Sequence, residues 1–338
     1  MTACLEFKDV RKTYRMRRGI SGGSIAVAAV AGVDLAVDYG ETVGLVGESG
    51  CGKSTLARLA VRLTRPSGGR VFLDGLDAWE DPTLPGRMPE MAQMIFQDPF
   101  ASLDPRMTIG QSVAEGLECR GLGNRSARAA RVVELLDMVG LSPGHASRYP
   151  HQFSGGQRQR AAIARALALN PRLVVCDEPV SALDVSIQAQ VINILEDLKS
   201  RLGLTYLFIS HDLAVVSHLS DRVAVMYAGR LVELAPATTL YAAPLHPYTR
   251  VLLAAVPAPD PGLRRASPAG LLRTRESLAA SAAHEQGPFP TGAVPGGNGC
   301  PLAGRCADES EACAVSPPPW REASTGHFVR CHAEYHRL

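Results

Sequence analysis

Residues 44–55 read GLVGESGCGKST, an apolar run that passes through four glycines into Lys53, Ser54 and Thr55. The spacing fits the pattern G-x-x-x-x-G-K-[ST], in which glycines let the backbone fold into a nest of inward-pointing N–H groups. A helix that begins at the lysine adds the positive end of its dipole to this nest. The stretch therefore predicts a phosphate-binding loop between a strand and a helix. Its candidate nucleotide-binding residues are Gly47, Glu48, Ser49, Gly50, Cys51, Gly52, Lys53, Ser54 and Thr55.

A second apolar run supplies the acidic groups that such a loop needs. Residues 172–179, RLVVCDEP, carry Asp177 and Glu178 at the end of an expected strand. Asp177 is placed to reach a loop-bound Mg²⁺ through water, while the Ser54 hydroxyl holds the ion directly. Glu178 is the candidate general base for an attacking water. The alternative, two acids that merely cap a strand, is disfavoured once the phosphate loop is accepted.

A third motif, QFSGGQRQR at residues 152–160, begins a long helix. Ser154 and Gln157 are spaced as a capping box, but a cap does not require the consecutive glycines Gly155 and Gly156. These glycines expose backbone N–H groups at the start of the helix, which predicts a second anion site. Two phosphate-binding helix ends in one chain indicate a nucleotide site that is shared between two molecules.

The order of apolar segments predicts the fold class. Strands alternate with helices, and the expected strands within 172–178 and 204–210 have continuous apolar centres. This pattern is typical of an α/β fold whose largely parallel sheet is covered on both faces. Residues 4–14 alternate apolar and polar side chains, as an edge strand does. Residues 98–165 are mostly helical in pattern and predict a subdomain.

Composition narrows the function classes. The chain has 338 residues, of which 46% are hydrophobic and 20% charged, as in ordinary globular proteins. The net charge of +2 gives no reason to expect a nucleic-acid partner. Neither a signal-peptide pattern nor an apolar run long enough for a membrane span is apparent, so a cytosolic protein is expected. Structural disulfides are rare in that compartment.

In this order the motifs resemble those of the nucleotide-binding subunits of ATP-binding cassette (ABC) transporters, over residues 5 to about 255. The resemblance implies an α/β P-loop ATPase domain at 1–255, with a mostly parallel sheet core, an antiparallel β edge and a helical subdomain at about 98–165. It implies ATP and Mg²⁺ as ligands. Tyr14 would stack on adenine, and Gln97 in MIFQDP would contact Mg²⁺ and the attacking water, so that Mg²⁺ is held through Ser54, Gln97 and Asp177.

The resemblance assigns the remaining motifs as well. FSGGQ matches the signature motif, with Phe153 in place of the commoner leucine, and Asp184 in SALD matches the D-loop. His211 in FISHD matches the switch histidine, which hydrogen-bonds the γ-phosphate. A triad of residues 210–212 is excluded, because adjacent residues of an extended segment point to opposite sides. In the family two subunits pair head to tail, so that the partner's ATP is completed by Ser154, Gly155, Gly156 and Gln157.

The C-terminal part of the sequence indicates which subgroup of ABC transporter ATPases the chain resembles. LHPYTR at 245–250 resembles the extension of ATPase subunits of oligopeptide and dipeptide importers, which we place at 240–338. A Pro-, Ala- and Gly-rich stretch at about 256–298 is expected to be a linker, because it cannot bury enough surface to fold alone. It leads to a small cysteine-rich tail at 299–338.

The tail contains half of the eight cysteines in the spacing C-x₅-C-x₆-C-x₁₇-C. Structural zinc sites usually include a C-x₂₋₄-C pair, which is absent here. Four thiolates on one segment fit a [4Fe–4S] cluster, and some similar tails in the subgroup carry one. Zinc and unligated or redox-sensitive thiols stay as alternatives, with His327 and His332 as substitute ligands. The candidate ligands are Cys300, Cys306, Cys313 and Cys331. The tail is expected to be a small domain that cannot build a core of its own.

The prediction for the whole chain is the ATP-hydrolysing subunit of an ABC importer for di- or oligopeptides or a related small solute. It would lie on the cytoplasmic face of the membrane. Its expected partners are a second ATPase subunit of a different chain, two transmembrane permease subunits and an extracytoplasmic solute-binding protein, with no nucleic acid. The permease would bind the cleft around Gln97 and residues 98–115. The alternative is a soluble ABC ATPase of DNA repair or translation with an iron–sulfur tail.

Overall fold

The computed structural model describes residues 3–17, 24–98, 102–255 and 299–333. The linker predicted at about 256–298 lies outside the described residues, as do residues 99–101 of the predicted permease contact and the last five residues of the tail. No helix among the described ranges is both long and apolar enough to cross a bilayer.

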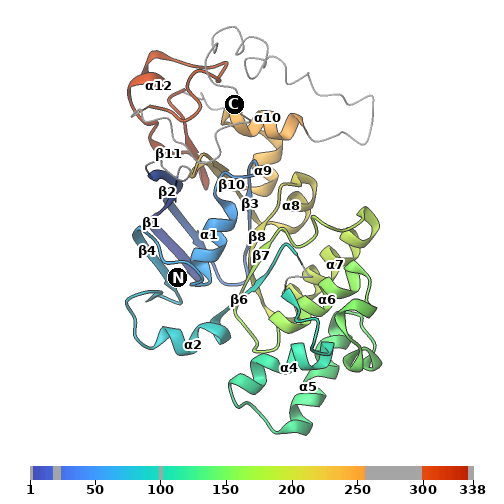
Figure 1. Ribbon diagram of the computed structural model, residues 1–338. Helices are drawn as coiled ribbons and strands as arrows, with labels where there is room; N and C mark the ends of the chain where they lie inside the picture. The colour runs from blue at the N-terminus through green and yellow to red at the C-terminus, as the bar shows by residue number, and fades with distance from the viewer. Residues whose placement is uncertain (1–2, 18–23, 99–101, 256–298, 334–338) are drawn as a thin grey trace.

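An eight-stranded sheet forms the centre of the molecule (Figure 1), in the order β11-β12-β10-β9-β3-β8-β7-β6. The five strands from β9 to β6 run parallel, and the three beyond β9 are antiparallel. Their bounds are β3 (Thr42–Val46), β6 (Ala92–Ile95), β7 (Leu173–Asp177), β8 (Thr205–Ile209), β9 (Arg222–Tyr227), β10 (Arg230–Pro236), β11 (Trp320–Ser324) and β12 (His327–Arg330). Every residue of β3, β7 and β8 is buried, as expected for central parallel strands covered on both faces.

A second sheet is antiparallel and has the order β2-β1-β4-β5. It consists of β1 (Leu5–Arg17), β2 (Ser24–Val37), β4 (Gly68–Leu73) and β5 (Leu76–Asp77). The prediction that the first strand is an edge strand is wrong, because β1 pairs with β2 on one side and β4 on the other. The alternation of apolar and polar residues in β1 instead indicates that one face of this strand is solvated. Leu5 and Phe7 are buried in the core, while Lys8 is exposed.

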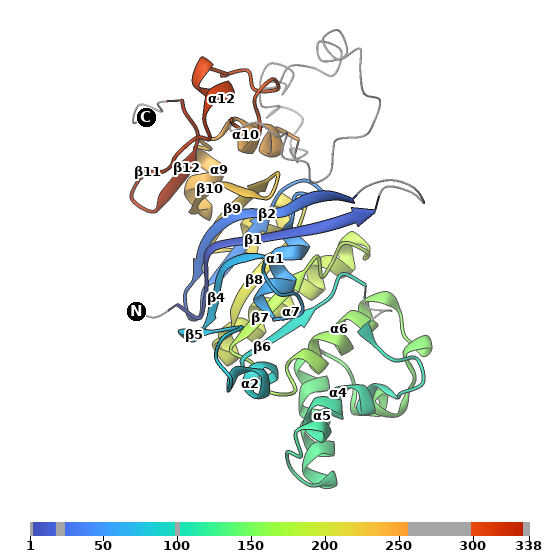
Figure 2. The ribbon, with the colours of Figure 1, turned by 60° about the vertical axis from the view of Figure 1, so that its left-hand side comes forward.

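Helix α1 (Lys53–Ala60) packs between the two sheets, with contacts to β2 on one side and to β7 and β8 on the other. The other face of the large sheet carries α7 (Val185–Leu202), α8 (Leu213–Leu219) and α9 (Ala237–Ala242), and α2 (Leu84–Met91) leads into β6. A separate helical layer consists of α4 (Ile109–Cys119), α5 (Arg125–Met138) and α6 (Gly155–Ala166). It extends away from the antiparallel sheet (Figure 2) and is joined to the rest through the contacts of α6 with α7 and β6.

The C-terminal tail continues the main sheet. Strand β12 pairs with β10 through Glu233↔Val329 and Leu234↔Phe328, and β11 adds the outermost strand. Leu302 and Cys306 belong to the same buried cluster as the central strands. The tail thus shares the core of the main domain, and the expected division into a separate small domain stays a prediction. Helices α10 (Pro247–Ala254) and α12 (Glu311–Val315) complete this end of the molecule.

Candidate nucleotide site

The loop between β3 and α1 is fixed by close backbone contacts. Gly47 and Gly52 have φ angles of 152° and 114°, in the region that favours glycine. A Cβ atom on Gly47 would lie 2.2 Å from the Met226 carbonyl oxygen, and one on Gly52 would lie 2.1 Å from the Ala29 carbonyl oxygen. Both positions therefore require glycine for conformation and for space.

The ammonium group of Lys53 is held inside this loop. Its Nζ donates to Gly47 O at 2.6 Å and to Glu48 O at 3.0 Å, and the side chain is buried. Lys53 thus carries the positive charge at the point where the backbone curls and the helix α1 begins. A phosphate group in the loop would meet this charge together with backbone N–H groups.

Three side chains from distant segments share a cavity with the loop. The cavity has a volume of about 480 Å³. Gln97 follows β6, Glu178 follows β7 and His211 follows β8, so that the carboxyl ends of neighbouring parallel strands bring them to one edge of the sheet. The loop contributes the other polar lining residues: Ser49, Gly50, Gly52, Lys53, Ser54 and Thr55.

Asp177 is a buried acid that lies against the loop. Its Oδ1 accepts a hydrogen bond from Ser54 Oγ at 3.0 Å. Burial raises the pKa of Asp177, the bond from Ser54 lowers it, and the neighbouring Glu178 raises it. A hydroxyl and a buried carboxylate in contact form the oxygen-rich donor set that Mg²⁺ prefers. The residues present therefore fit a magnesium ion.

Glu178 is the acid at which the predicted catalytic groups meet. Its Oε2 accepts from Gln97 Nε2 at 3.0 Å and lies 3.2 Å from His211 Nδ1. The backbone of Glu178 has φ 49°, an uncommon conformation for a residue with a side chain, and its N–H donates to Ile209 O at 3.0 Å. Local strain of this kind is typical of functional sites. The three predicted catalytic side chains are thus in direct contact.

Tyr14 is not among the residues that line this cavity. Its side chain lies on β1 and is 37% exposed, with Lys12 Nζ at 5.1 Å from the ring centroid. Tyr14 therefore lies on the surface of the antiparallel sheet. Its stacking on the adenine base stays a prediction.

The signature residues lie apart from the loop of their own chain. Ser154 caps α6, with Gln157 N donating to Ser154 Oγ at 3.3 Å and Ser154 N donating to Gln157 Oε1 at 3.1 Å, which is the predicted capping box. None of residues 154–157 lines the cavity at the loop, and Figure 1 shows α6 in the helical layer, well separated from α1. Asp184 is the N-cap residue of α7 and is exposed.

The two signature glycines have different neighbours. A Cβ atom on Gly156 would lie 2.4 Å from Ile187 Cγ2, so close packing of α6 on α7 already requires glycine there. A Cβ atom on Gly155 would lie 3.4 Å from Leu183 Cδ2, which is an ordinary contact. Packing within the chain therefore explains Gly156 and leaves Gly155 unexplained. Sequence reasoning treated both glycines alike.

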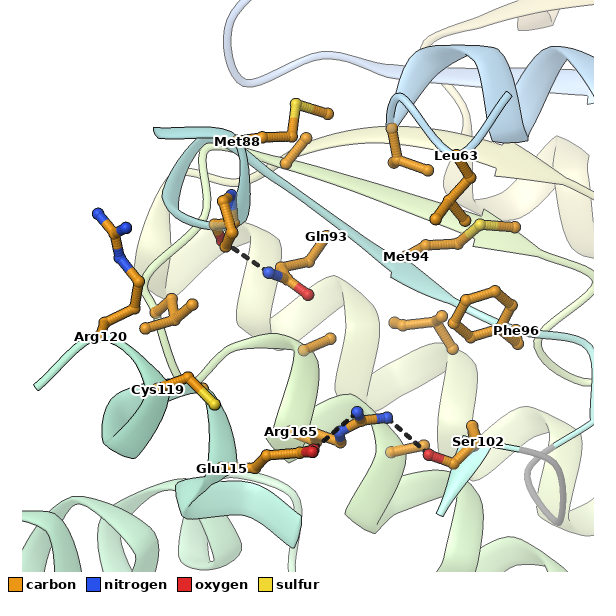
Figure 3. Close-up of a pocket in the computed structure, with 18 residues that line it drawn as sticks. Leu63, Met88, Gln93, Met94, Phe96, Ser102, Glu115, Cys119, Arg120 and Arg165 are labelled. Carbon is orange, nitrogen blue, oxygen red and sulfur yellow. Dashed lines mark hydrogen bonds and ion pairs between the residues drawn. The ribbon is translucent and has the colours of Figure 1, made fainter. Parts of the chain in front are cut away.

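A second cavity, of about 390 Å³, lies between β6 and the helical layer (Figure 3). Met88, Met94 and Phe96 line it beside β6, and Figure 3 shows Glu115 and Arg165 on the helical side. Arg165 donates to Ser102 O at 2.6 Å and to Glu115 Oε2 at 2.9 Å, which fixes that side. The cavity lies in the region predicted to bind a permease.

The four tail cysteines are free thiols. The pKa of Cys306 is raised to about 11, chiefly by burial and to a smaller extent by the neighbouring Asp308, Cys331 and Cys300. Within the described ranges, however, no three His, Cys, Asp or Glu side chains converge as a metal-binding group. The two histidines considered as substitute ligands are engaged elsewhere: His327 Nε2 lies 2.7 Å from Glu233 Oε1, and His332 Nε2 lies 2.9 Å from Ser316 O.

Comparisons with known proteins agree with this geometry. The family model of ABC transporters matches residues 30–181, and that of the oligopeptide/dipeptide transporter C-terminal region matches residues 232–313. The oligopeptide transport ATP-binding protein AppF of Bacillus subtilis is 46% identical over 97% of this chain and 96% of its own length. A putative peptide import ATP-binding protein of Brucella ovis is 47% identical over 98% of both chains. The dimeric ATP-binding cassette MJ0796 bound to ADP and Pi is similar in structure, with a TM-score of 0.62, 31% identity, and coverage of 69% of this chain and 98% of that chain.

Proposed function

The chain belongs to the ATP-binding proteins of ABC transporters, and on that premise we propose that its ATP hydrolysis drives the import of di- or oligopeptides, or a related small solute, through a separate permease. The observation that carries the proposal is the convergence of the phosphate loop, Gln97, Glu178 and His211 on one cavity. Relatives named for peptide import favour this function over a soluble ATPase of DNA repair or translation.

The geometry indicates a role for each group in hydrolysis. Lys53 and the loop N–H groups bind the phosphates, and Ser54, Asp177 and Gln97 would hold Mg²⁺, which offsets the charge of the phosphoryl group in transfer. Glu178 accepts the proton of a water whose oxygen attacks the γ-phosphorus, while the bond from that phosphorus to the bridging oxygen of ADP breaks. His211, beside Glu178, is placed to donate to the γ-phosphate.

The signature residues support a two-subunit site. Gly155 has a neighbour only at ordinary contact distance, and its helix start lies outside the loop cavity of its own chain. We infer that Ser154–Gln157 complete the ATP site of a partner ATPase subunit, and that Asp184 lies at the junction between the two. The proposal takes this partner to be a different ATPase chain.

The cavity in Figure 3 is the proposed seat of the permease. Its wall is apolar beside β6, its opposite side is fixed by Arg165, and Gln97 lies two residues beyond the end of β6. A permease segment docked there would contact the strand that leads to the catalytic glutamine. The proposal includes a location on the cytoplasmic face of the membrane, with two permease subunits and an extracytoplasmic solute-binding protein as the other partners.

For the tail, the proposal includes a [4Fe–4S] cluster on the four cysteines, with zinc as the alternative. Its support is the donor set, four free thiols on one segment. Such a group would crosslink the segment from 300 to 331. Anaerobic purification tests it: visible absorption that Cys306→Ser removes supports the cluster, and a colourless protein with stoichiometric zinc supports the alternative.

The function is tested with the full chain. Protein purified with its ATPase partner should hydrolyse ATP, and Lys53→Ala should lower that activity. In membranes with the permease, the chain should sediment with the bilayer, and Leu63→Asp at the rim of the permease cavity should release it. Leu122→Asp is the matched control, because Leu122 is also exposed but does not line that cavity. Release by both variants, or by neither, contradicts the proposed seat.

A further inference from the structure

A tyrosine of the C-terminal extension reaches the phosphate loop. Tyr248, in the first turn of α10, is buried, and its hydroxyl accepts a hydrogen bond from the backbone N–H of Glu48 at 2.9 Å. Figures 1 and 2 both show α10 beside the tail and above the central sheet. Nothing in the loop motif itself requires this contact, which joins residues 200 positions apart.

The N–H that Tyr248 contacts belongs to a peptide group that also contacts Lys53. The peptide between Gly47 and Glu48 contains Gly47 O, to which Lys53 Nζ donates at 2.6 Å. In a planar trans peptide the carbonyl and the N–H point in opposite directions. The two sides of this peptide group therefore have different partners. Its N–H donates to the Tyr248 hydroxyl, and its carbonyl oxygen accepts from the ammonium group of Lys53. Rotation of this plane would displace the ammonium group that is to meet the phosphates.

The other side of the loop is held by β9 and the turn after it. The Met226 carbonyl oxygen leaves no room for a Cβ atom on Gly47, and the Gly229 N–H donates to Cys51 O at 2.9 Å. These backbone contacts fix the position of the loop. They leave the plane of the Gly47–Glu48 peptide to be set by Tyr248 and Lys53.

The tail supports Tyr248 through a second tyrosine. The rings of Tyr227 and Tyr248 pack with centroids 4.6 Å apart, and Tyr227 OH accepts from Arg305 at 3.3 Å. Arg305 precedes Cys306, one of the four tail cysteines. A second contact joins α10 to the tail, with Arg250 lying 3.8 Å from Asp308. A continuous set of contacts thus runs from the tail to the loop.

We propose that Tyr248 is a positioning residue for the phosphate loop, and that Tyr227 and Arg305 make nucleotide affinity depend on the docked tail. The inference rests on the proposed ATPase function and adds a residue that belongs to no nucleotide motif. The tail does not contact the phosphates in this proposal. It acts by fixing the Gly47–Glu48 peptide, whose carbonyl oxygen accepts a hydrogen bond from Lys53.

A buried tyrosine can also serve stability alone, and the chain offers a matched control. Tyr206 is likewise buried, and its hydroxyl donates to a backbone carbonyl, Leu195 O, at 3.0 Å. It does not line the loop cavity. Tyr206→Phe and Tyr248→Phe each remove one buried hydroxyl that is bonded to the backbone, so their effects on unfolding should be similar. Only the second should change nucleotide binding.

The experiment measures the dissociation constant for ATP, the KM for hydrolysis and the thermal unfolding of the full chain. Tyr248→Phe should weaken ATP binding about threefold to tenfold, the range that one hydrogen bond accounts for. Arg305→Gln, a change outside the loop, should weaken it about twofold to threefold with little effect on unfolding. Tyr206→Phe should leave affinity unchanged.

Equal ATP affinity in Tyr248→Phe and Tyr206→Phe would overturn the positioning role. Unchanged ATP affinity in Arg305→Gln would overturn the dependence of binding on the tail. This variant also keeps the proposal testable if Tyr248→Phe fails to fold. A wild-type chain that, together with its ATPase partner, binds ATP without hydrolysing it would instead contradict the proposed function. Because binding is measured independently of turnover, the two failures are distinguishable.

Discussion

Alanine substitutions at the two signature glycines should separate packing from function. In Gly156→Ala the new methyl would lie 2.4 Å from Ile187 Cγ2, about 1 Å inside an ordinary contact distance of roughly 3.4 Å. Helix α6 or Ile187 must move, and overpacking of this kind costs about 1–3 kcal/mol. In Gly155→Ala the methyl would meet Leu183 Cδ2 at 3.4 Å, so no movement is needed. Alanine is also the better helix former, by about 1 kcal/mol in a helix interior.

The two variants should therefore have opposite effects on stability. Gly156→Ala should lower the free energy of unfolding, measured by urea denaturation, whereas Gly155→Ala should keep or raise it. Gly155→Ala should nevertheless lower ATP hydrolysis by the assembled ATPase pair about 100-fold, because its methyl would intrude on the phosphate of the partner's ATP. Ile187→Ala removes the clashing methyl, so Gly156→Ala should cost less stability in that background than in the wild-type chain.

Two outcomes would refute this reasoning. Wild-type hydrolysis by Gly155→Ala would show that the start of α6 does not approach a nucleotide. A Gly156→Ala variant as stable as the wild type when Ile187 is present would show that the packing of α6 on α7 does not require glycine.

The other predictions concern the acids and the tail. Glu178→Gln should lower turnover at least about 100-fold while ATP binding persists, because it removes the proton acceptor; unchanged phosphate release would exclude Glu178 as the base. Burial raises the pKa of Asp177, so its ionised form is less favoured in the folded than in the unfolded chain. Its contribution to stability falls as the pH rises from the ordinary carboxyl range through the raised pKa. Asp177→Asn should therefore raise the melting temperature of the metal-free protein at neutral pH and abolish Mg²⁺-dependent hydrolysis, whereas a lower melting temperature would contradict the buried charge. His327→Ala should remove one contact of the buried Glu233 carboxylate, which keeps the N–H groups of Leu245 and His246, and should cost about 2 kcal/mol. Limited proteolysis should then cleave the tail first, and uniform resistance would exclude the pair as a tail contact.

The parts of the site that sequence predicts are those encoded by short spacing. The phosphate loop, the acids after β7 and the capping box of α6 each depend on residues within a few positions of one another. Their convergence follows because parallel strands end at one edge of the sheet. The α/β class and the helical layer follow from periodicity alone.

Features that depend on distant pairing were missed. The alternation in β1 indicates one solvated face but not which strands lie beside it, so the edge assignment failed. The addition of β12 to β10, the buried pair of His327 with Glu233, and the contact of Tyr248 with Glu48 each join segments far apart in the chain. No local pattern specifies such partners. Likewise, Ile187 explains Gly156 only once α6 and α7 are seen in contact.

The most direct test is a structure of the Glu178→Gln chain with its ATPase partner, Mg²⁺ and ATP. We expect each triphosphate to lie between the loop at 47–55 of one subunit and the signature segment of the other. The Gly155 N–H should then be within about 3 Å of a γ-phosphate oxygen bound to the partner subunit. Residues 154–157 facing solvent, with ATP enclosed by a single chain, would contradict the shared site on which the mechanism depends.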